Sequence, residues 1–149
     1  MSRAFAVATS FAAQVGAWVL KTERRMTIVT QQATNDLIKN IPIKDGLTRG
    51  GSRPKGSIPR DNGAIARSLQ SSLYGSTGLT GPESYSFVVG AMKAGDKASF
   101  VWGGAAAPHA RANHYGFRGV QGTMWIPEAA AKWQGYVDAA IVRAKAQVR

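Results

Sequence analysis

The chain has 149 residues, of which 44% are hydrophobic; this excludes disorder throughout and suffices for the core of one ordinary domain. It contains no cysteine, which excludes disulfides and thiolate metal sites. Its 19 lysines and arginines outnumber 8 acids and give a net charge of +11, which bears on partners, such as nucleic acid or an acidic protein surface, more than on the fold.

The first forty residues predict an amphipathic helix, because apolar residues recur there at three-to-four spacing. Residues 4–20 are too short and too polar to span a membrane. A cleaved signal peptide is not expected either, because the apolar residues are spaced as in a helix and the pattern continues past Lys21. The β-branched run at 27–30 weakens helix propensity, so the pattern allows one helix from Ser2 to Lys39 or two with a break near Arg25. Pro42 ends it. The apolar positions are Phe11, Val15, Trp18, Val29, Ala33, Leu37 and Ile41.

A single helix of that length would be about 55 Å long, which exceeds the width of a small domain. We therefore expect part of it to project toward a partner.

Residues 44–63 predict a loop, because glycine and proline interrupt them repeatedly. Loops this long inside a domain are usually functional or disordered. The segment is either a connector or a basic arm that orders against a partner. Its candidate partner-facing residues are Arg49, Arg53, Lys55 and Arg60.

The middle of the chain predicts an antiparallel hairpin. Residues 64–74 fit both a helical and a two-residue period. After a turn at 75–82, SYSFVVGAM alternates, with Tyr85, Phe87 and Val89 on one face, and after KAGD the stretch KASFVWG alternates again, with Phe100 and Trp102. Two strands joined by a short loop follow from this pattern.

Residues 103–122 are rich in glycine and alanine and are expected to form a loop, and Pro127 is expected to open a closing helix. The buried stripe predicted for that helix contains Trp133, Val137, Ala140, Ile141, Ala144 and Val148. The expected fold is α+β, with a long N-terminal helix and a C-terminal helix packed on a small antiparallel sheet. We expect one domain over 1–149: a helical arm (1–41), the basic loop (44–63), and the sheet, an HYG loop and the closing helix (64–149).

Catalytic and cofactor chemistry find little support in the sequence. His109 and His114 are the only histidines, and no acid lies between Asp96 and Glu128, so the three or four ligands of a metal site are not gathered there. No GxSxG, Walker A or GxGxxG motif is present. We expect no enzyme activity, no cofactor and no metal.

Residues 58–68, IPRDNGAIARS, place proline, aspartate, glycine and serine at the spacing P-x-D-x-G-x-x-x-x-S. The stretch resembles the element P-x-D-T-G-x-L-x-x-S of the neck, head–tail joining or tail-completion proteins of long-tailed bacteriophages, with Asn62 for threonine and Ile65 for leucine. Residues 110–116, ARANHYG, resemble Y-A-x-x-x-H/E-Y/F-G, with His109 in place of tyrosine. Residues 125–127, WIP, lead into a final helix as family members do. The resemblance covers roughly residues 20–145, and the order of the elements is more specific than any one of them.

The resemblance implies a structural virion protein that forms a ring, commonly of six copies, between the portal-side connector and the tail. Its neighbours would be connector or adaptor proteins and the tail tube or terminator, DNA would pass through its channel without sequence recognition, and no membrane partner is implied. Synthesis would take place in the host bacterial cytoplasm. Two alternatives stay open: a tail terminator that caps the tube, and a basic DNA-binding protein.

Physical roles can be assigned to the matched residues. Pro59 and Gly63 suit a sharp turn that Asp61 would cap, and Ser68 would bond the backbone locally. His114 and Tyr115 would anchor the long loop, and Gly116 would allow close backbone approach. A fold-holding role is favoured over direct partner contact for these residues. The complete motif set is Pro59, Asp61, Gly63, Ser68, His114, Tyr115, Gly116 and Trp125.

Overall fold

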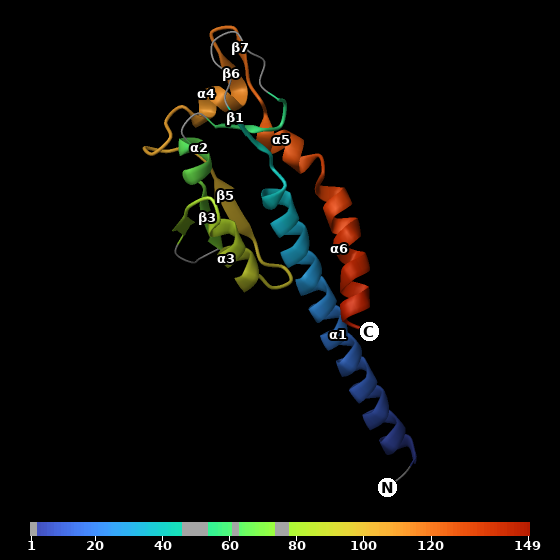
Figure 1. The fold of residues 1–149 in the computed structure, drawn as a ribbon. Coiled ribbons are helices and arrows are strands. Elements are labelled where there is room, and N and C mark those ends of the chain that lie inside the picture. The colour runs from blue at the N-terminus through green and yellow to red at the C-terminus, as the bar shows by residue number, and fades with distance from the viewer. Residues whose placement is uncertain (1–2, 46–53, 61–62, 74–77) are drawn as a thin grey trace.

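The computed structural model describes residues 3–45, 54–60, 63–73 and 78–149 (Figure 1). Within these ranges the elements run in the order α1 (Arg3–Lys39), β1 (Ile43–Asp45), β2 (Ile58–Arg60), α2 (Ala64–Arg67), β3 (Gln70–Leu73), β4 (Leu79–Thr80), α3 (Ser84–Ala91), β5 (Ala98–Val101), α4 (Ala110–Tyr115), β6 (Gly116–Phe117), β7 (Val120–Gln121), α5 (Trp125–Ala130) and α6 (Trp133–Gln147). The α+β architecture with a long N-terminal helix, a C-terminal helix and a small antiparallel sheet is confirmed.

The first helix is a single element of 37 residues, so the alternative with a break near Arg25 is wrong. Two threonines that weaken the pattern are accommodated by bonds to the preceding turn. The hydroxyl of Thr22 donates to the carbonyl of Trp18 at 2.9 Å, and that of Thr30 to the carbonyl of Met26 at 2.9 Å. Such bonds satisfy a polar side chain inside a helix without interrupting the backbone ladder.

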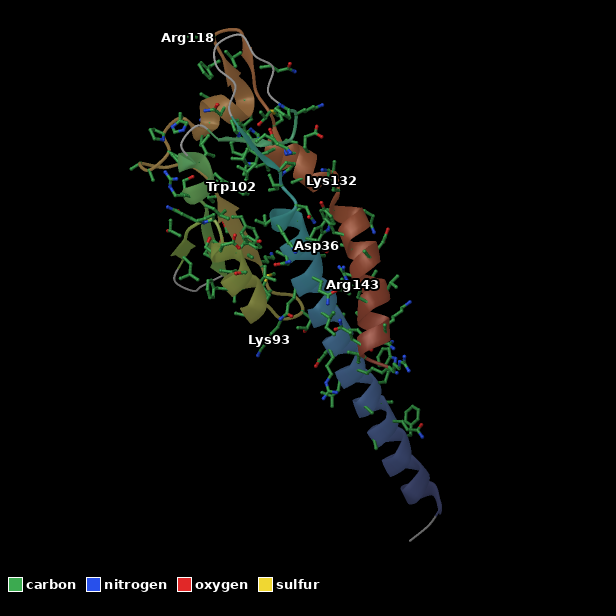
Figure 2. The ribbon with its side chains drawn as sticks, viewed as in Figure 1. Asp36, Lys93, Trp102, Arg118, Lys132 and Arg143 are labelled. Carbon is green, nitrogen blue, oxygen red and sulfur yellow. The ribbon has the colours of Figure 1, made fainter. Side chains whose placement is uncertain are left out.

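Helices α6 and α3 flank α1 on opposite sides (Figure 1). Helix α6 runs antiparallel to the C-terminal half of α1: Arg25 Nε donates to the carbonyl of Val148 at 2.8 Å, and Arg143 meets Asp36 at 2.9 Å (Figure 2). The end of α3 is held on the other side, where Gln31 Nε2 donates to the carbonyl of Met92 at 2.7 Å. The N-terminal half of α1 extends past the end of α6 (Figure 1).

The antiparallel sheet has the strand order β4-β3-β5, with Gln70 opposite Val101 and Leu73 opposite Ala98. Residues 98–101 form the expected strand, with Ala98 and Phe100 less exposed than their neighbours. Its partner is β3, however, and the predicted hairpin with 84–91 is wrong.

Residues 84–91 are helix α3, whose buried side chains have helical spacing: Tyr85, Val88, Val89 and, just beyond the helix, Met92. Phe87, which the alternating pattern placed inside, is 70% exposed. The ambiguous segment 64–74 contains both a helical turn, α2, and strand β3.

Two further strand pairs lie where loops were expected. Strand β1 pairs in parallel with β2, Ile43 opposite Ile58, so both ends of the basic loop are ordered against each other. The segment predicted as an HYG loop is instead helix α4 followed by the β6–β7 pair, with Gly116 opposite Gln121. The loop predictions for both segments are therefore wrong in part.

The closing helix begins at Trp125 rather than at Pro127 and is divided into α5 and α6. The division falls at Ala131 and Lys132, where the Lys132 amide bonds to the carbonyl three residues earlier, Ala129, at 3.0 Å. Of the predicted stripe, Ala140 and Ala144 are buried, Val137 and Val148 are half-buried, and Trp133 and Ile141 stay 39% and 36% exposed.

The core lies where α1 ends and the strands, α3, α4 and α5 meet. Among the strands, β2 supplies Ile58 and β5 supplies Phe100, and Trp125, 2% exposed, and Leu69, 2% exposed, are the largest fully buried members of the core. Among the described residues, no helix combines the length and the apolar character needed to cross a bilayer.

Candidate functional site

The first motif forms a tight turn into α2 that is tied to the rest of the body. Gly63 has a φ of 81°, in the left-handed region that glycine adopts without strain. Ser68 is buried; its hydroxyl donates to the carbonyl of Ile65 at 2.6 Å and accepts from the amide of Gly103 at 2.9 Å. Pro59 is buried in β2. The predicted roles of Gly63 and Ser68 are confirmed, and Asp61 lies outside the described residues.

His114, in the second motif, is held inside its own chain. It is 4% exposed, and its Nε2 accepts a hydrogen bond from the backbone amide of Ile126 at 3.2 Å. A nitrogen that accepts carries no proton, so the neutral ring has its proton on Nδ1. Burial lowers the pKa of His114, which favours this neutral form. The predicted anchoring by His114 is confirmed.

Tyr115 behaves differently from its neighbour. Its side chain is 64% exposed, and its ring packs edge-on against that of His114 with 4.4 Å between centroids. The guanidinium carbon of Arg111 lies 5.9 Å from the centre of the tyrosine ring. Tyr115 is thus a surface residue of α4, and the described contacts include no hydrogen bond of its hydroxyl that would provide the anchoring predicted for it.

Backbone bonds join the end of α4 to the segment that leads into α5. The amide of Thr123 donates to the carbonyl of Asn113 at 3.1 Å, and that of Met124 to the carbonyl of His114 at 3.0 Å. The two backbone segments approach each other so closely here that only glycine fits at two positions. A Cβ on Gly116, whose φ is 98°, would lie 2.7 Å from the carbonyl oxygen of Val120. A Cβ on Gly122 would overlap the carbonyl oxygen of His114, so the close approach predicted for Gly116 is confirmed and also requires Gly122.

Trp125 is the point at which the motifs meet. Its ring packs edge-on against His114, with centroids 4.6 Å apart, and against Trp102, with centroids 6.2 Å apart. Ile58 and Ile65 from the first motif belong to the same buried cluster. The three motif elements, which are as distant in sequence as Ile58 and Trp125, therefore converge on one buried core, while Tyr115 and Ile126 stay on the surface.

The two ends of the basic loop belong to the described residues. Arg49 and Arg53 lie outside the described residues, as does the side chain of Arg60. Lys55 is exposed, and its ammonium lies 3.2 Å from a carboxylate oxygen of Glu128 at the start of α5. This cation is therefore directed back onto its own chain.

An exposed apolar surface lies on the projecting half of α1. Residues 11–20 are all exposed, with Phe11 66% and Trp18 65% exposed. Single exposed apolar residues are ordinary, but two aromatic rings with several aliphatic side chains on one helix typify an interaction surface.

The described surface also has open clefts. One of about 450 Å³ lies where α1 faces α3 and Arg143, and one of about 420 Å³ lies beside Leu73 and residues 95–97. The described residues contain no group of three or more potential metal ligands. A cleft of about 100 Å³ between the end of α1 and α3 is lined by Ile38, Leu69, Tyr85 and Trp102 among others. Ligand pockets commonly have volumes of about 300–1,000 Å³.

No protein-family model matches this chain, and the searches of curated proteins and of solved structures found no significant match.

Sequence reasoning identified most of the motif residues and expected part of the first helix to project, but it missed Gly122. Gly122 had no recognisable signal, since one glycine in a glycine-rich stretch looks like any other. The uncovered arm surface had a signal, because the apolar stripe was read at Phe11, Val15 and Trp18, but only the position of α6 shows where its cover ends.

Proposed function

We propose that this chain is a structural virion subunit that assembles with copies of itself into a ring at the junction between a phage head and its tail. The observation that carries the proposal is the architecture of α1: one half is built into the body, and the other half projects with its apolar side chains uncovered. Exposing such a surface is costly for a lone soluble molecule and is typical of a subunit that buries it on assembly.

The motif residues support the same proposal in a different way. They follow the order found in the neck and tail-completion family, and here they form the packed centre of the body around Trp125. Their role is to hold the fold, whereas surfaces remote from them make the contacts between subunits. A net charge of +11 suits a ring whose channel carries DNA through contacts with its phosphates.

Deleting the gene from a phage that encodes this chain tests the proposal. The expected phenotype is filled heads and finished tails of normal length that fail to join, visible by negative-stain electron microscopy. Overlong tails would instead support the tail-terminator alternative. Filter binding to duplex DNA across a salt series tests the DNA-binding alternative, which requires affinity that falls steeply as salt rises.

A further inference from the structure

The projecting half of α1 begins where α6 stops. Arg25 Nε donates to the carbonyl of Val148, the residue that follows α6, at 2.8 Å, so helix α6 ends beside Arg25. Residues 11–24 continue beyond it for about 20 Å at 1.5 Å per residue. We call residues 11–26 the arm.

The arm carries one continuous apolar stripe. At about 100° per residue, Phe11, Val15 and Trp18 fall within a sector of about 60°. Val19, 39% exposed, and Met26, 53% exposed, widen it to about 100°. Leu20, 56% exposed, falls on the opposite side of the helix.

The stripe continues a surface that α6 covers further along. The residues of α1 in the same sector, Val29 and Ala33, are half-buried and fully buried. Asp36, which bonds to Arg143 of α6, falls in the same sector, whereas Gln31, which bonds to the end of α3, falls on the other side. The arm therefore presents the same face that packs against a helix within the body, and a second helix fits it.

We infer that the arm of one copy packs on the outer face of α6 of a second copy. That outer face is exposed and consists mainly of small residues, which leave room for the aromatic rings of the arm. Its members are Gly135, Asp138, Ala139, Val142 and Ala146.

Charge favours the same occupant. Asp138 is exposed, with a hydrogen bond only from Gln134 of its own helix at 2.8 Å among the described contacts. Lys21 of the arm flanks the stripe on its Trp18 side, so the contact brings one cation toward this acid, whereas Arg24 falls on the side of Leu20. Pairing two arms in parallel would instead place Lys21 beside its own copy and pack large rings against large rings.

The available area is of the right order. With about 150–250 Å² per aromatic side chain, the exposed fractions of Phe11 and Trp18 amount to roughly 250 Å² together. Val15, Val19 and Met26 add to this, so the stripe supplies roughly half of the 800 Å² that each partner contributes to a standard interface. In a closed ring each copy makes two such contacts. The choice of this head-to-tail contact over a two-fold one rests on the proposed ring function, because two different surfaces on each copy generate a ring or an open chain.

Disulfide trapping tests the contact directly, because the natural chain has no cysteine. The full-length double variant Val15→Cys/Ala139→Cys places one thiol on each proposed surface. Counted along the antiparallel pair, the two positions are roughly 28 Å apart in one copy, far beyond the roughly 6 Å between Cα atoms that a disulfide requires. Oxidation is expected to give a ladder of covalent oligomers on a non-reducing gel that collapses on reduction.

The controls separate the possible contacts. Each single variant alone should stay uncrosslinked, their mixture should give dimers, and Val15→Cys/Phe87→Cys, whose second thiol lies on the exposed side of α3, should give no ladder. A dimer from Val15→Cys alone would show an arm–arm pair and overturn the inference. A double variant that has the circular dichroism of the natural chain but gives no ladder at the highest soluble concentration would also overturn it.

A second pair of variants measures the contact without thiols. Trp18→Lys removes the central ring of the stripe and should weaken self-association roughly thirty-fold, as expected for an aromatic anchor. Leu20→Lys makes the same change on the opposite side of the same helix and should leave association unchanged. Association that survives Trp18→Lys in native mass spectrometry would overturn the arm contact but leave the proposed ring intact. A full ladder from a chain that is absent from the head–tail junction would overturn the function and leave the contact intact.

Discussion

The close approach of two backbones at Gly122 makes a specific prediction for Gly122→Ala. The glycine has ordinary backbone geometry, so alanine would not be strained by its dihedral angles. Its Cβ, however, would overlap the carbonyl oxygen of His114 and the carbonyl carbon of Tyr115. These atoms belong to the backbone and cannot rotate away, so the overlap can be relieved only by moving the two backbone segments apart.

The structure allows the magnitude to be worked out. Separating the two segments weakens the backbone hydrogen bonds from Thr123 to Asn113 and from Met124 to His114, each of which contributes about 1 kcal/mol net. Overpacking adds about 1–3 kcal/mol, which brings the expected loss of unfolding free energy to about 3–5 kcal/mol. For a domain of this size that corresponds to a fall in Tm of about 10 °C or more.

Urea unfolding followed by tryptophan fluorescence measures this loss, because Trp125 lies beside the altered segment. The matched control is Gly135→Ala in α6, where a Cβ meets nothing within 4 Å. If Gly122→Ala unfolded within about 0.5 kcal/mol of the natural chain, the limit for ordinary surface substitutions, the close packing deduced here would be wrong.

Three further predictions concern the buried histidine, the central tryptophan and the helices. Because burial lowers the pKa of His114 below its ordinary value of about 6.5, the unfolded chain binds that proton more tightly. The free energy of unfolding should thus have its highest value above about pH 6.5 and fall as the pH drops through that value. In urea titrations, His114→Gln should show a smaller fall in this free energy between pH 7 and 5.5 than the natural chain. An equal fall in the two proteins would refute the role of His114. Trp125→Ala should cost about 3–5 kcal/mol in the same assay, and a loss below 1 kcal/mol would contradict its place at the centre of the core. Gly135→Ala should stabilise the chain by up to about 1 kcal/mol, and a loss of stability above about 1 kcal/mol would show tight packing at this open site. Arg143→Ala removes a partly exposed ion pair with Asp36 and should cost less than about 1 kcal/mol; a loss above about 2 kcal/mol would show that this site is not open.

Several parts of the fold could be predicted because local chemistry determines them. The long first helix follows from its apolar spacing and from Pro42, and the left-handed turn at Gly63 follows from the only residue type that adopts it freely. Strand β5 follows from its alternation. In each case the structure that forms depends on residues within the element itself.

The errors arose where tertiary packing decided between two local patterns. In 84–91 the sequence alternates at Tyr85, Phe87 and Val89, but the same stretch also places Tyr85, Val88, Val89 and Met92 at helical spacing. Burial against β3 selects the helical set, and Ser84 is fixed there by a 2.8 Å hydrogen bond to Ser71. Sequence alone contains no information on which strand would lie beneath it.

For the candidate site, too, the sequence predicted some features correctly and others not. The motif residues were identified, and most are buried, as a fold-holding role requires; Tyr115 is the exposed exception. Lys55, expected to face a partner, pairs with Glu128, a contact that depends on the packing of segments more than 70 residues apart. The arm surface could be defined only once the end of α6 was known.

The most direct test of the proposed function is electron cryomicroscopy of intact particles of a phage that encodes this chain. The account predicts a ring of copies at the head–tail junction, with each body fitting the density and each arm reaching the α6 helix of the next copy. Density for this chain in the capsid shell or at the tail tip, or its absence from the particle, would contradict it.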